Sequence, residues 1–195
     1  MLPGKIFSKR LVHLPFNNQN ILLNYMKLKN FLMIFSDKTM KLIVQQVNFA
    51  TIHIQDKENN LDEIRKIGKG VIIYLGVGRD NMQDERYQAR IDKFLDKFTR
   101  LRCRDDEKEN LSASITDTGG ELLIVSNFTL YAHYKSGNKM SFSHSAKFTE
   151  AKTLYDYFVS QAQAIFPDRI QTGEFGAKMH ITSEVAGPVN YILEI

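Results

Sequence analysis

The sequence has 195 residues, of which 43% are hydrophobic and 25% are charged, and it contains one cysteine. This length is typical of one domain, and the composition is typical of a globular rather than a disordered chain. The single cysteine excludes an internal disulfide, and no apolar run approaches the roughly 20 residues that a membrane helix needs.

The net charge of +4 is unevenly distributed along the chain. Residues 1–39 contain six Lys or Arg residues and one Asp, a net charge of +5, so residues 40–195 carry −1. The basic excess therefore does not indicate that residues 40–195 bind nucleic acid. We expect an N-terminal extension over residues 1–39 and one domain over residues 40–195. Three interpretations of the extension stay open: an organellar presequence, an ordered extension, or sequence upstream of a true start at Met40.

The first predicted elements are strands. Residues 41–54 are rich in β-branched side chains and predict one long strand or a bent pair, followed by a turn over residues 56–60. Residues 70–77 are almost continuously apolar between glycines. This is the pattern of a strand that is covered on both faces, and it favours helices packed on the sheet.

Two amphipathic helices follow from the spacing of apolar residues. Between Asn81 and Leu101 the apolar residues recur at steps of 4, 3, 1 and 3, which places them on one helical face. The stretch from Phe148 to Phe166 repeats this pattern, and Pro167 ends it. Further strands are predicted over residues 121–125, 175–182 and 189–195, with a turn over residues 118–120.

Familiar hydrolase and metal-binding motifs are absent from the sequence. It has no G-x-S-x-G elbow, no H-E-x-x-H and no cysteine pair, and its five histidines show no metal-ligand spacing. We therefore predict neither a metal nor a cofactor. Gly76-Val77-Gly78 lacks the third glycine of a dinucleotide-binding fingerprint and is predicted to be a strand exit.

Two charged features have an ordinary structural interpretation. Cys103 lies between Arg102 and Arg104, whose charges favour the thiolate, but without a positioned base we expect a packed side chain. A basic stripe runs along the first predicted helix, with acidic residues interleaved, and is predicted to be a solvated, salt-bridged face. The stripe consists of Arg86, Arg90, Lys93 and Lys97.

Two short segments carry more information about function. A strand that runs into residues 126–129, Ser-Asn-Phe-Thr, places small polar groups at a sheet edge, where backbone N–H groups can leave the ladder and face a ligand. Gly187-Pro188 lies inside the closing strand, although proline cannot donate to the ladder and glycine weakens it. Such a pair requires an edge, a bend or a special peptide geometry.

Both segments belong to a wider resemblance. Residues 125–131, Val-Ser-Asn-Phe-Thr-Leu-Tyr, are similar to a V-S-Q-F-T-L-Y motif, and residues 186–190 resemble an N-x-G-P-V-T motif. Both motifs are found in the D-aminoacyl-tRNA deacylases, and similar segments recur in order over residues 40–195. The resemblance implies a single-domain α/β fold with three layers and a mixed sheet. It also implies an enzyme that hydrolyses the ester of D-aminoacyl-tRNA, or of glycyl-tRNA mischarged on tRNA-Ala, as chiral proofreading in translation quality control.

The resemblance implies a role for each motif residue. The catalytic segment consists of Ser126, Asn127, Phe128 and Thr129. Within it, the backbone N–H groups of Phe128 and Thr129 are expected to face the ester carbonyl, and Thr129 is expected to help position water or the substrate. The family relies on the 2′-hydroxyl of the tRNA rather than on a side-chain nucleophile, which agrees with the missing triad.

A homodimer is also implied, in which the Gly-Pro element of one subunit enters the active site of the other. Gly187 and Pro188 are expected to hold the substrate's amino group through two carbonyls and to leave no room for an L side chain. Gln46 is expected to support this element. The segment that resembles the pocket wall includes Gly176, Ala177 and Met179. The expected partner is aminoacyl-tRNA, and no association with a membrane is expected. The expected location is the cytoplasm, or an organelle if residues 1–39 are a presequence.

Several residues depart from the family pattern. Asn127 replaces the motif glutamine, Gln46 stands where D-specific members carry arginine, and Asn190 replaces a threonine. These departures support an alternative, a catalytically weakened paralogue that binds nucleic acid or a protein partner. A third hypothesis is an unrelated hydrolase that uses Cys103.

Overall fold

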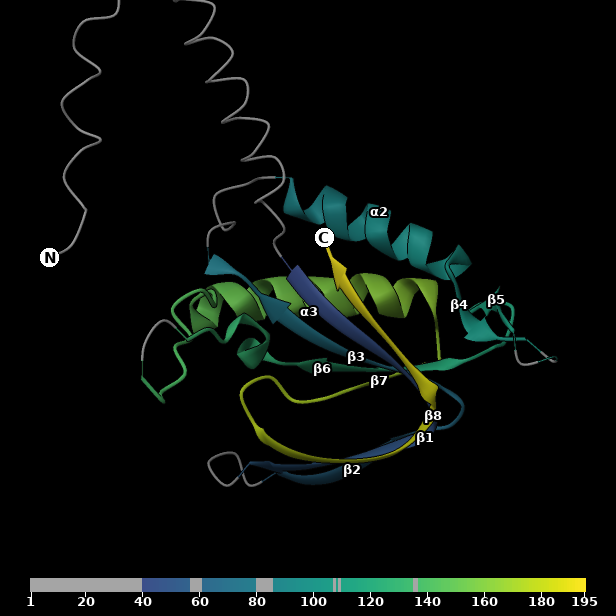
Figure 1. The fold of residues 1–195 in the computed structure, drawn as a ribbon, viewed down its shortest axis with the longest axis horizontal. Coiled ribbons are helices and arrows are strands. Elements are labelled where there is room, and N and C mark those ends of the chain that lie inside the picture. The colour runs from purple at the N-terminus through teal and green to yellow at the C-terminus, as the bar shows by residue number, and fades with distance from the viewer. Residues whose placement is uncertain (1–39, 57–60, 80–85, 107, 109, 135–136) are drawn as a thin grey trace, which may run out of the picture. The chain divides into compact units, whose positions relative to one another are not determined.

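The computed structural model describes residues 40–56, 61–79, 86–106, 108, 110–134 and 137–195 (Figure 1). The predicted extension, residues 57–60 of the turn predicted over residues 56–60, and the start of the first predicted helix lie outside the described residues. The strands are β1 (Met40–Asp56), β2 (Leu61–Ile67), β3 (Gly70–Val77), β4 (Arg102–Asp105), β5 (Leu111–Ser114), β6 (Glu121–Ser126), β7 (Ile170–Thr172) and β8 (Lys178–Glu194). The helices are α2 (Tyr87–Arg100), the short 3-10 helix η2 (Phe128–Tyr131) and α3 (Phe148–Ile165).

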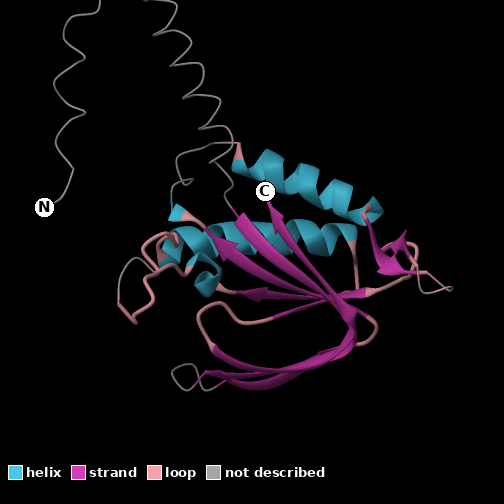
Figure 2. Cartoon of the chain, in the orientation of Figure 1, coloured by secondary structure: helices cyan, strands magenta, loops and turns pink. Residues whose placement is uncertain are grey.

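The long strand β1 organises the main sheet. Its first half pairs antiparallel with β3, its second half pairs antiparallel with β2, and β8 runs antiparallel along almost its whole length. The described sheet has the order β2-β1-β3-β6-β7, with β8 on β1, and β3, β6 and β7 are mutually parallel. Figure 2 shows that β1 and β8 bend strongly. The second half of β1, the first half of β8 and β2 therefore curl away from the helices. The sheet is therefore mixed and folds back on itself.

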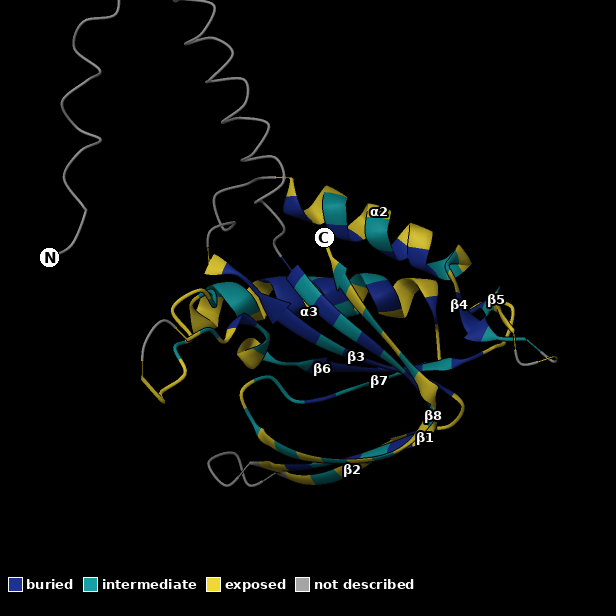
Figure 3. Ribbon diagram, viewed as in Figure 1, coloured by how far each residue is buried: buried dark blue, intermediate teal, exposed yellow. Residues whose placement is uncertain are grey.

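Apolar side chains fill both faces of the parallel pair β3 and β6. On one face, residues such as Val71 and Ile73 pack against α2 and α3 in a large buried cluster. On the other face, Ile72 and Leu123 pack against the curled half of β1 in a second cluster. In the described residues the two clusters separate three layers, with α2 and α3 on the first face, and Figure 3 shows these helices turning their buried sides toward the sheet. The sequence predicted both buried faces, but the second is covered by the sheet itself rather than by a helix.

Most predicted elements are present in this mixed α/β fold. The strands over residues 41–54, 70–77 and 121–125 and both helices are confirmed, and the turn over residues 118–120 is built around Gly119, whose φ of +61° favours glycine. The two strands predicted over residues 175–182 and 189–195 form one continuous strand, β8. Three parts of the structure were not predicted from the sequence: β2, the β4–β5 hairpin and β7.

Candidate active site

The candidate site lies at the carboxyl end of the parallel strands β3 and β6, where ligands of α/β sheets commonly bind. The last ladder bond of this pair is the donation of the Asn127 N–H to the Leu75 carbonyl at 2.7 Å. The chain then leaves the sheet and turns into η2. Close packing at this corner depends on Gly76, because a Cβ there would come within 2.8 Å of the Asn127 carbonyl oxygen.

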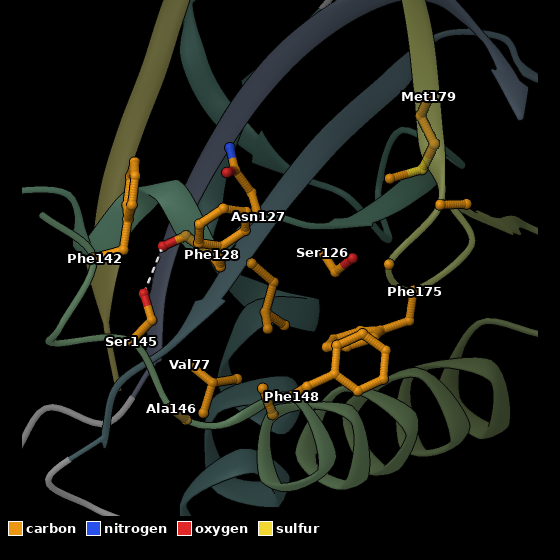
Figure 4. A pocket seen from close by; sticks show the side chains of 14 residues that line it. Val77, Ser126, Asn127, Phe128, Phe142, Ser145, Ala146, Phe148, Phe175 and Met179 are labelled. Carbon is orange, nitrogen blue, oxygen red and sulfur yellow. Dashed lines mark hydrogen bonds between the residues drawn. The ribbon is translucent and has the colours of Figure 1, made fainter. Parts of the chain in front are cut away.

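A cavity of about 550 Å³ opens beside this turn. Figure 4 shows side chains from four parts of the chain converging on it: the end of β3, the β6–η2 turn, the segment before α3 with the start of α3, and the segment before β8. Most of them are apolar or aromatic. The lining residues are Leu75, Val77, Ser126, Asn127, Phe128, Phe142, Ser145, Ala146, Phe148, Ala151, Phe175, Gly176, Ala177 and Met179. The structure thus brings together Ser126, Asn127 and Phe128 of the predicted catalytic segment with the predicted wall residues.

The side chain of Asn127 caps the turn. Its Oδ1 atom accepts the Thr129 backbone N–H at 3.1 Å and also accepts the Thr129 hydroxyl. This differs from the sequence expectation that the Thr129 N–H faces the substrate, because the shortened amide of Asn127 reaches that donor. The Thr129 hydroxyl likewise donates its hydrogen bond to Asn127, and within the described ranges no His, Asp or Glu side chain bonds to this hydroxyl.

Phe128 supplies the remaining backbone donor. No hydrogen bond in the described part of the chain uses the N–H of Phe128, whereas its carbonyl accepts the Ser145 hydroxyl at 2.9 Å. The Phe128 ring is 59% exposed and packs edge-on against Phe142, with ring centroids 5.1 Å apart. Ser145 was not found from the sequence, because 17 residues separate it from Phe128 and no motif links them.

The opposite wall is held by Arg65 and Tyr155. The Arg65 guanidinium donates to the Thr172 carbonyl at 2.7 Å and to the Thr172 hydroxyl, which ties β2 to β7 just before the wall segment. Its hydrogen bond to Glu63 raises the pKa of Arg65, and the guanidinium is charged throughout the physiological range. The Tyr155 ring packs against Phe175 of the wall, with centroids 5.4 Å apart, while its buried hydroxyl donates to the Ile124 carbonyl, and burial raises the pKa of that hydroxyl. The wall therefore rests on a cation and a neutral phenol.

The Gly-Pro element lies on an irregular part of β8. Between the register pairs Gln45–Asn190 and Val47–Val185, β1 contributes Gln46 alone, while β8 contributes residues 186–189. The Gly187-Pro188 peptide bond is cis, and Gly187 has a φ of +117°. Both residues are exposed, and neither lines the first cavity.

Gly187 instead borders a second, more polar cavity of about 980 Å³. Gln46, 3% exposed, lies at its base and donates its Nε2 amide to Asp105. In the described structure, the buried Gln46 Oε1 and Arg104 Nε atoms have no hydrogen-bond partner. Gln46 and Gly187 thus border the same cavity, but no hydrogen bond between them is found in the described structure, and the expected support of the Gly-Pro element by Gln46 stays a prediction.

The residues with an ordinary interpretation behave as packed or surface groups. Cys103 is buried, and desolvation raises the pKa of its thiol despite the nearby Arg104 charge, so the thiolate is disfavoured at neutral pH. On α2, Arg100 pairs with Asp96 at 2.6 Å, but Arg100 is not one of the four residues of the predicted stripe, so the salt-bridged face stays a prediction. Among the described residues, no three His, Cys, Asp or Glu side chains gather as a metal site would, and no helix is long and apolar enough to span a membrane.

The fold and the site together define an α/β protein with a mostly apolar cavity at the end of a parallel strand pair, bordered by Phe128, whose N–H forms no hydrogen bond within the described residues. The D-Tyr-tRNA(Tyr) deacylase family model matches residues 43–194. The chain belongs to this family.

Individual relatives agree with this assignment. The chain is 38% identical over 156 residues to a D-aminoacyl-tRNA deacylase of Thermosipho melanesiensis, covering 80% of this chain and 97% of that protein. It is also 38% identical to a D-aminoacyl-tRNA deacylase of Pseudoalteromonas translucida, covering 80% of this chain and all of that protein.

Two solved structures share the fold. One is a c-Myc DNA unwinding element binding protein, at 30% identity and a TM-score of 0.66, with 80% of this chain and 98% of that chain covered. The other is a probable eukaryotic D-amino acid tRNA deacylase, at 17% identity and a TM-score of 0.69, with 80% and 100% covered.

Proposed function

We propose that this protein hydrolyses the ester bond of D-aminoacyl-tRNA and releases the free D-amino acid and tRNA. The observation that carries the proposal is that Phe128 lines the cavity and its N–H forms no hydrogen bond in the described structure, in a chain that belongs to the deacylase family. The aromatic rings of Phe148 and Phe175 suit the terminal base of the tRNA, because unpaired bases stack on such rings.

The chemistry uses water as the nucleophile. Attack on the ester carbonyl carbon places negative charge on the carbonyl oxygen, and the Phe128 N–H donates to that oxygen. A preorganised donor of this kind stabilises the transition state by about 3 kcal/mol. The bond to the ribose oxygen then breaks, the ribose oxygen takes a proton, and the acid is released. The Thr129 hydroxyl donates its hydrogen bond to Asn127 and is not activated as a nucleophile. The attack is therefore assisted by the neighbouring 2′-hydroxyl of the tRNA and not by a side chain.

A second protomer completes the site in this proposal. Gly187 and Pro188 are exposed on a bulge and lie outside their own chain's cavity, so they are available to enter the cavity of a partner in a homodimer. Their carbonyls hold the substrate's amino group and exclude an L side chain by steric conflict. Glycyl-tRNA lacks a side chain and passes this filter. The reaction is therefore chiral proofreading in the cytoplasm, or in an organelle if residues 1–39 direct import.

Three esters test the activity: D-Tyr-tRNA, glycyl-tRNA and L-Tyr-tRNA. We expect hydrolysis of the first two and protection of the third. Equal hydrolysis of the D and L esters would contradict the chiral filter, and a monomer by light scattering at assay concentration would contradict the shared site.

A proline substitution tests the backbone donor. Phe128→Pro deletes the N–H at the first position of η2, where proline is tolerated, and Asn127 before it is already extended, with φ −146° and ψ 91°. We expect kcat to fall about 100-fold or more. Phe128→Ala keeps the N–H and removes the ring, so it should lose much less. Equal losses in the two variants would show that the ring, rather than the N–H, carries the effect.

A nucleic-acid-binding paralogue is the second candidate function. It is favoured by the 30% identity to a protein named for binding a DNA unwinding element. This candidate predicts binding of tRNA or DNA without turnover of any of the three esters, even at high protein concentration.

A further inference from the structure

We propose that Ser145 and Asn127 are positioning residues that hold the peptide group between Phe128 and Thr129 at both ends and so keep the Phe128 carbonyl turned away from the side on which the Phe128 N–H meets the substrate. This inference rests on the proposed hydrolysis, and it assigns a role to a residue, Ser145, that no motif indicates.

Two side-chain hydrogen bonds hold the same peptide group, the one between Phe128 and Thr129. The Ser145 hydroxyl donates to its carbonyl oxygen, on Phe128, at 2.9 Å. The Asn127 Oδ1 atom accepts its N–H, on Thr129, at 3.1 Å. The carbonyl oxygen and the N–H of this peptide group are therefore each bonded to a side chain. One side chain belongs to the residue before Phe128 and the other to a residue 17 positions after it.

The backbone around each of these two residues is itself hydrogen-bonded to the end of β3. Asn127 donates its backbone N–H to Leu75 at 2.7 Å. The segment around Ser145 is attached two residues further along β3, because the Ala146 N–H donates to the Val77 carbonyl at 2.9 Å and Gly78 forms a β-bridge with Ser145. The peptide group is thus held against a buried strand rather than against a mobile surface.

The orientation of this peptide group decides what a substrate carbonyl would meet. In a helical turn the N–H groups point toward the N-terminal end and the carbonyls toward the C-terminal end, so the N–H and the carbonyl of Phe128 point in opposite directions. If the peptide group turned over, the Phe128 carbonyl would point to the side of the Phe128 N–H. Its partial negative charge would then repel the developing oxyanion instead of stabilising it. Holding the carbonyl on Ser145 prevents this arrangement.

Ser145→Ala, Ser145→Thr and Ser143→Ala form a matched series. Ser145→Ala removes the hydroxyl, Ser145→Thr keeps it, and Ser143→Ala removes a neighbouring exposed hydroxyl that does not contact Phe128. With D-Tyr-tRNA we expect Ser145→Ala to lower kcat about tenfold with KM unchanged, because the donor acts in the transition state. Ser145→Thr should restore most of kcat, and Ser143→Ala should match the unsubstituted protein. A raised KM at constant kcat, or an equal loss in Ser143→Ala, would overturn the proposal.

Amide hydrogen exchange tests the same contact without turnover. In the full-length protein the Thr129 amide should exchange slowly and the Phe128 amide quickly, and Ser145→Ala should speed exchange at Thr129 at least fivefold without changing the thermal midpoint. Absence of hydrolysis by the unsubstituted protein would refute the proposed function, and the exchange rates would still decide the positioning role. Unchanged exchange at Thr129 in Ser145→Ala would refute it even in an active enzyme.

Discussion

Gln46 of β1 stands alone opposite the four-residue bulge of β8 that carries Gly187. The bulge arises because the two strands keep their pairing on both sides of it, at Gln45–Asn190 and at Val47–Val185. The Gln46 side chain is therefore buried, whereas Gly187 and Pro188 on the opposite bulge are exposed.

Replacement of Gln46 by leucine should cost stability as well as selectivity. The change leaves the half-buried Asp105 carboxylate without the amide that it accepts, and a lost partner of this kind costs about 1–3 kcal/mol. We expect chemical denaturation to show that loss and the D/L hydrolysis ratio to fall. The matched control is Gln45→Leu, since Gln45 bonds to Asn190 at the exposed surface. If both variants lose the same stability, the buried amide has no special role.

A Cβ at Gly187 should impair selectivity more than stability. Gly187 has a φ of +117°, which side chains rarely adopt, and a Cβ there would lie 2.6 Å from the Val189 side chain. Gly187→Ala should cost about 1 kcal/mol and should increase hydrolysis of L-Tyr-tRNA relative to D-Tyr-tRNA.

Gly119→Ala is the control for backbone strain at this position. Gly119 also has a positive φ, +61°, but open space surrounds its Cβ position, and it lines neither cavity itself, although Thr118 beside it borders the second one. It should show a similar loss of stability with an unchanged D/L ratio. An unchanged ratio in Gly187→Ala would argue against the Gly-Pro element as a filter.

The sequence predicted the elements whose signal is local and missed those that depend on pairing. Residues 70–77 and both helices were found from periodicity, and residues 126–129 from a strand that ends in small polar groups. In contrast, β2 is a charged edge strand that becomes recognisable only when its residues pair with the second half of β1. β7 is three residues long, too short for any periodicity.

The same distinction applies to the candidate site. The motif residues were predicted, but not that Asn127 would take the Thr129 N–H, because a side-chain cap depends on a side-chain rotamer and on the turn that follows. Ser145 and Arg65 act on the site from distant positions in the chain, through bonds that only the folded backbone brings within reach. Sequence reasoning therefore named several of the residues that line the candidate cavity but not the contacts that hold its shape.

Arg65→Ala should weaken substrate binding more than catalysis. Arg65 holds Thr172 just before the wall residues Gly176 and Ala177, and it does not touch the Phe128 turn. We expect KM to rise about fivefold, kcat to change less than twofold, and the free energy of unfolding to fall by about 1–3 kcal/mol. Lys66→Ala, at the exposed neighbouring position of β2, should change neither constant. A fall in kcat at constant KM would place Arg65 in the chemistry instead.

Cys103 should behave as a neutral core residue. Burial raises the pKa of its thiol, an effect that outweighs the opposing charge of Arg104. The native protein should therefore resist alkylation by iodoacetamide at pH 8 and react once unfolded. Labelling at the rate of a free thiol would contradict this, and it would revive a role for Cys103 as a nucleophile.

The raised thiol pKa also predicts a direction for stability against pH. Above the ordinary thiol pKa, the unfolded chain loses a proton that the folded chain keeps. The stabilising contribution is thus complete below that pKa and declines as pH rises toward the folded value. Denaturation at pH 7.5 and pH 9.5 should show a larger drop for the unsubstituted protein than for Cys103→Ala. An equal drop would mean that the thiol does not contribute.

Gly76→Ala should damage the active site through its backbone. A Cβ at Gly76 would lie 2.8 Å from the Asn127 carbonyl oxygen and 3.0 Å from the Leu130 Cβ, so the turn that carries the Phe128 N–H would have to move away from β3. Overpacking of this kind costs about 1–3 kcal/mol, and a displaced donor should lower kcat at least tenfold. Gly68→Ala is the matched control, because the nearest atoms to its Cβ are the Glu121 carboxylate oxygens at 3.9 Å and 4.0 Å. Kinetics with D-Tyr-tRNA and thermal denaturation of both variants measure the two effects, and a normal kcat in Gly76→Ala would show that the turn tolerates displacement.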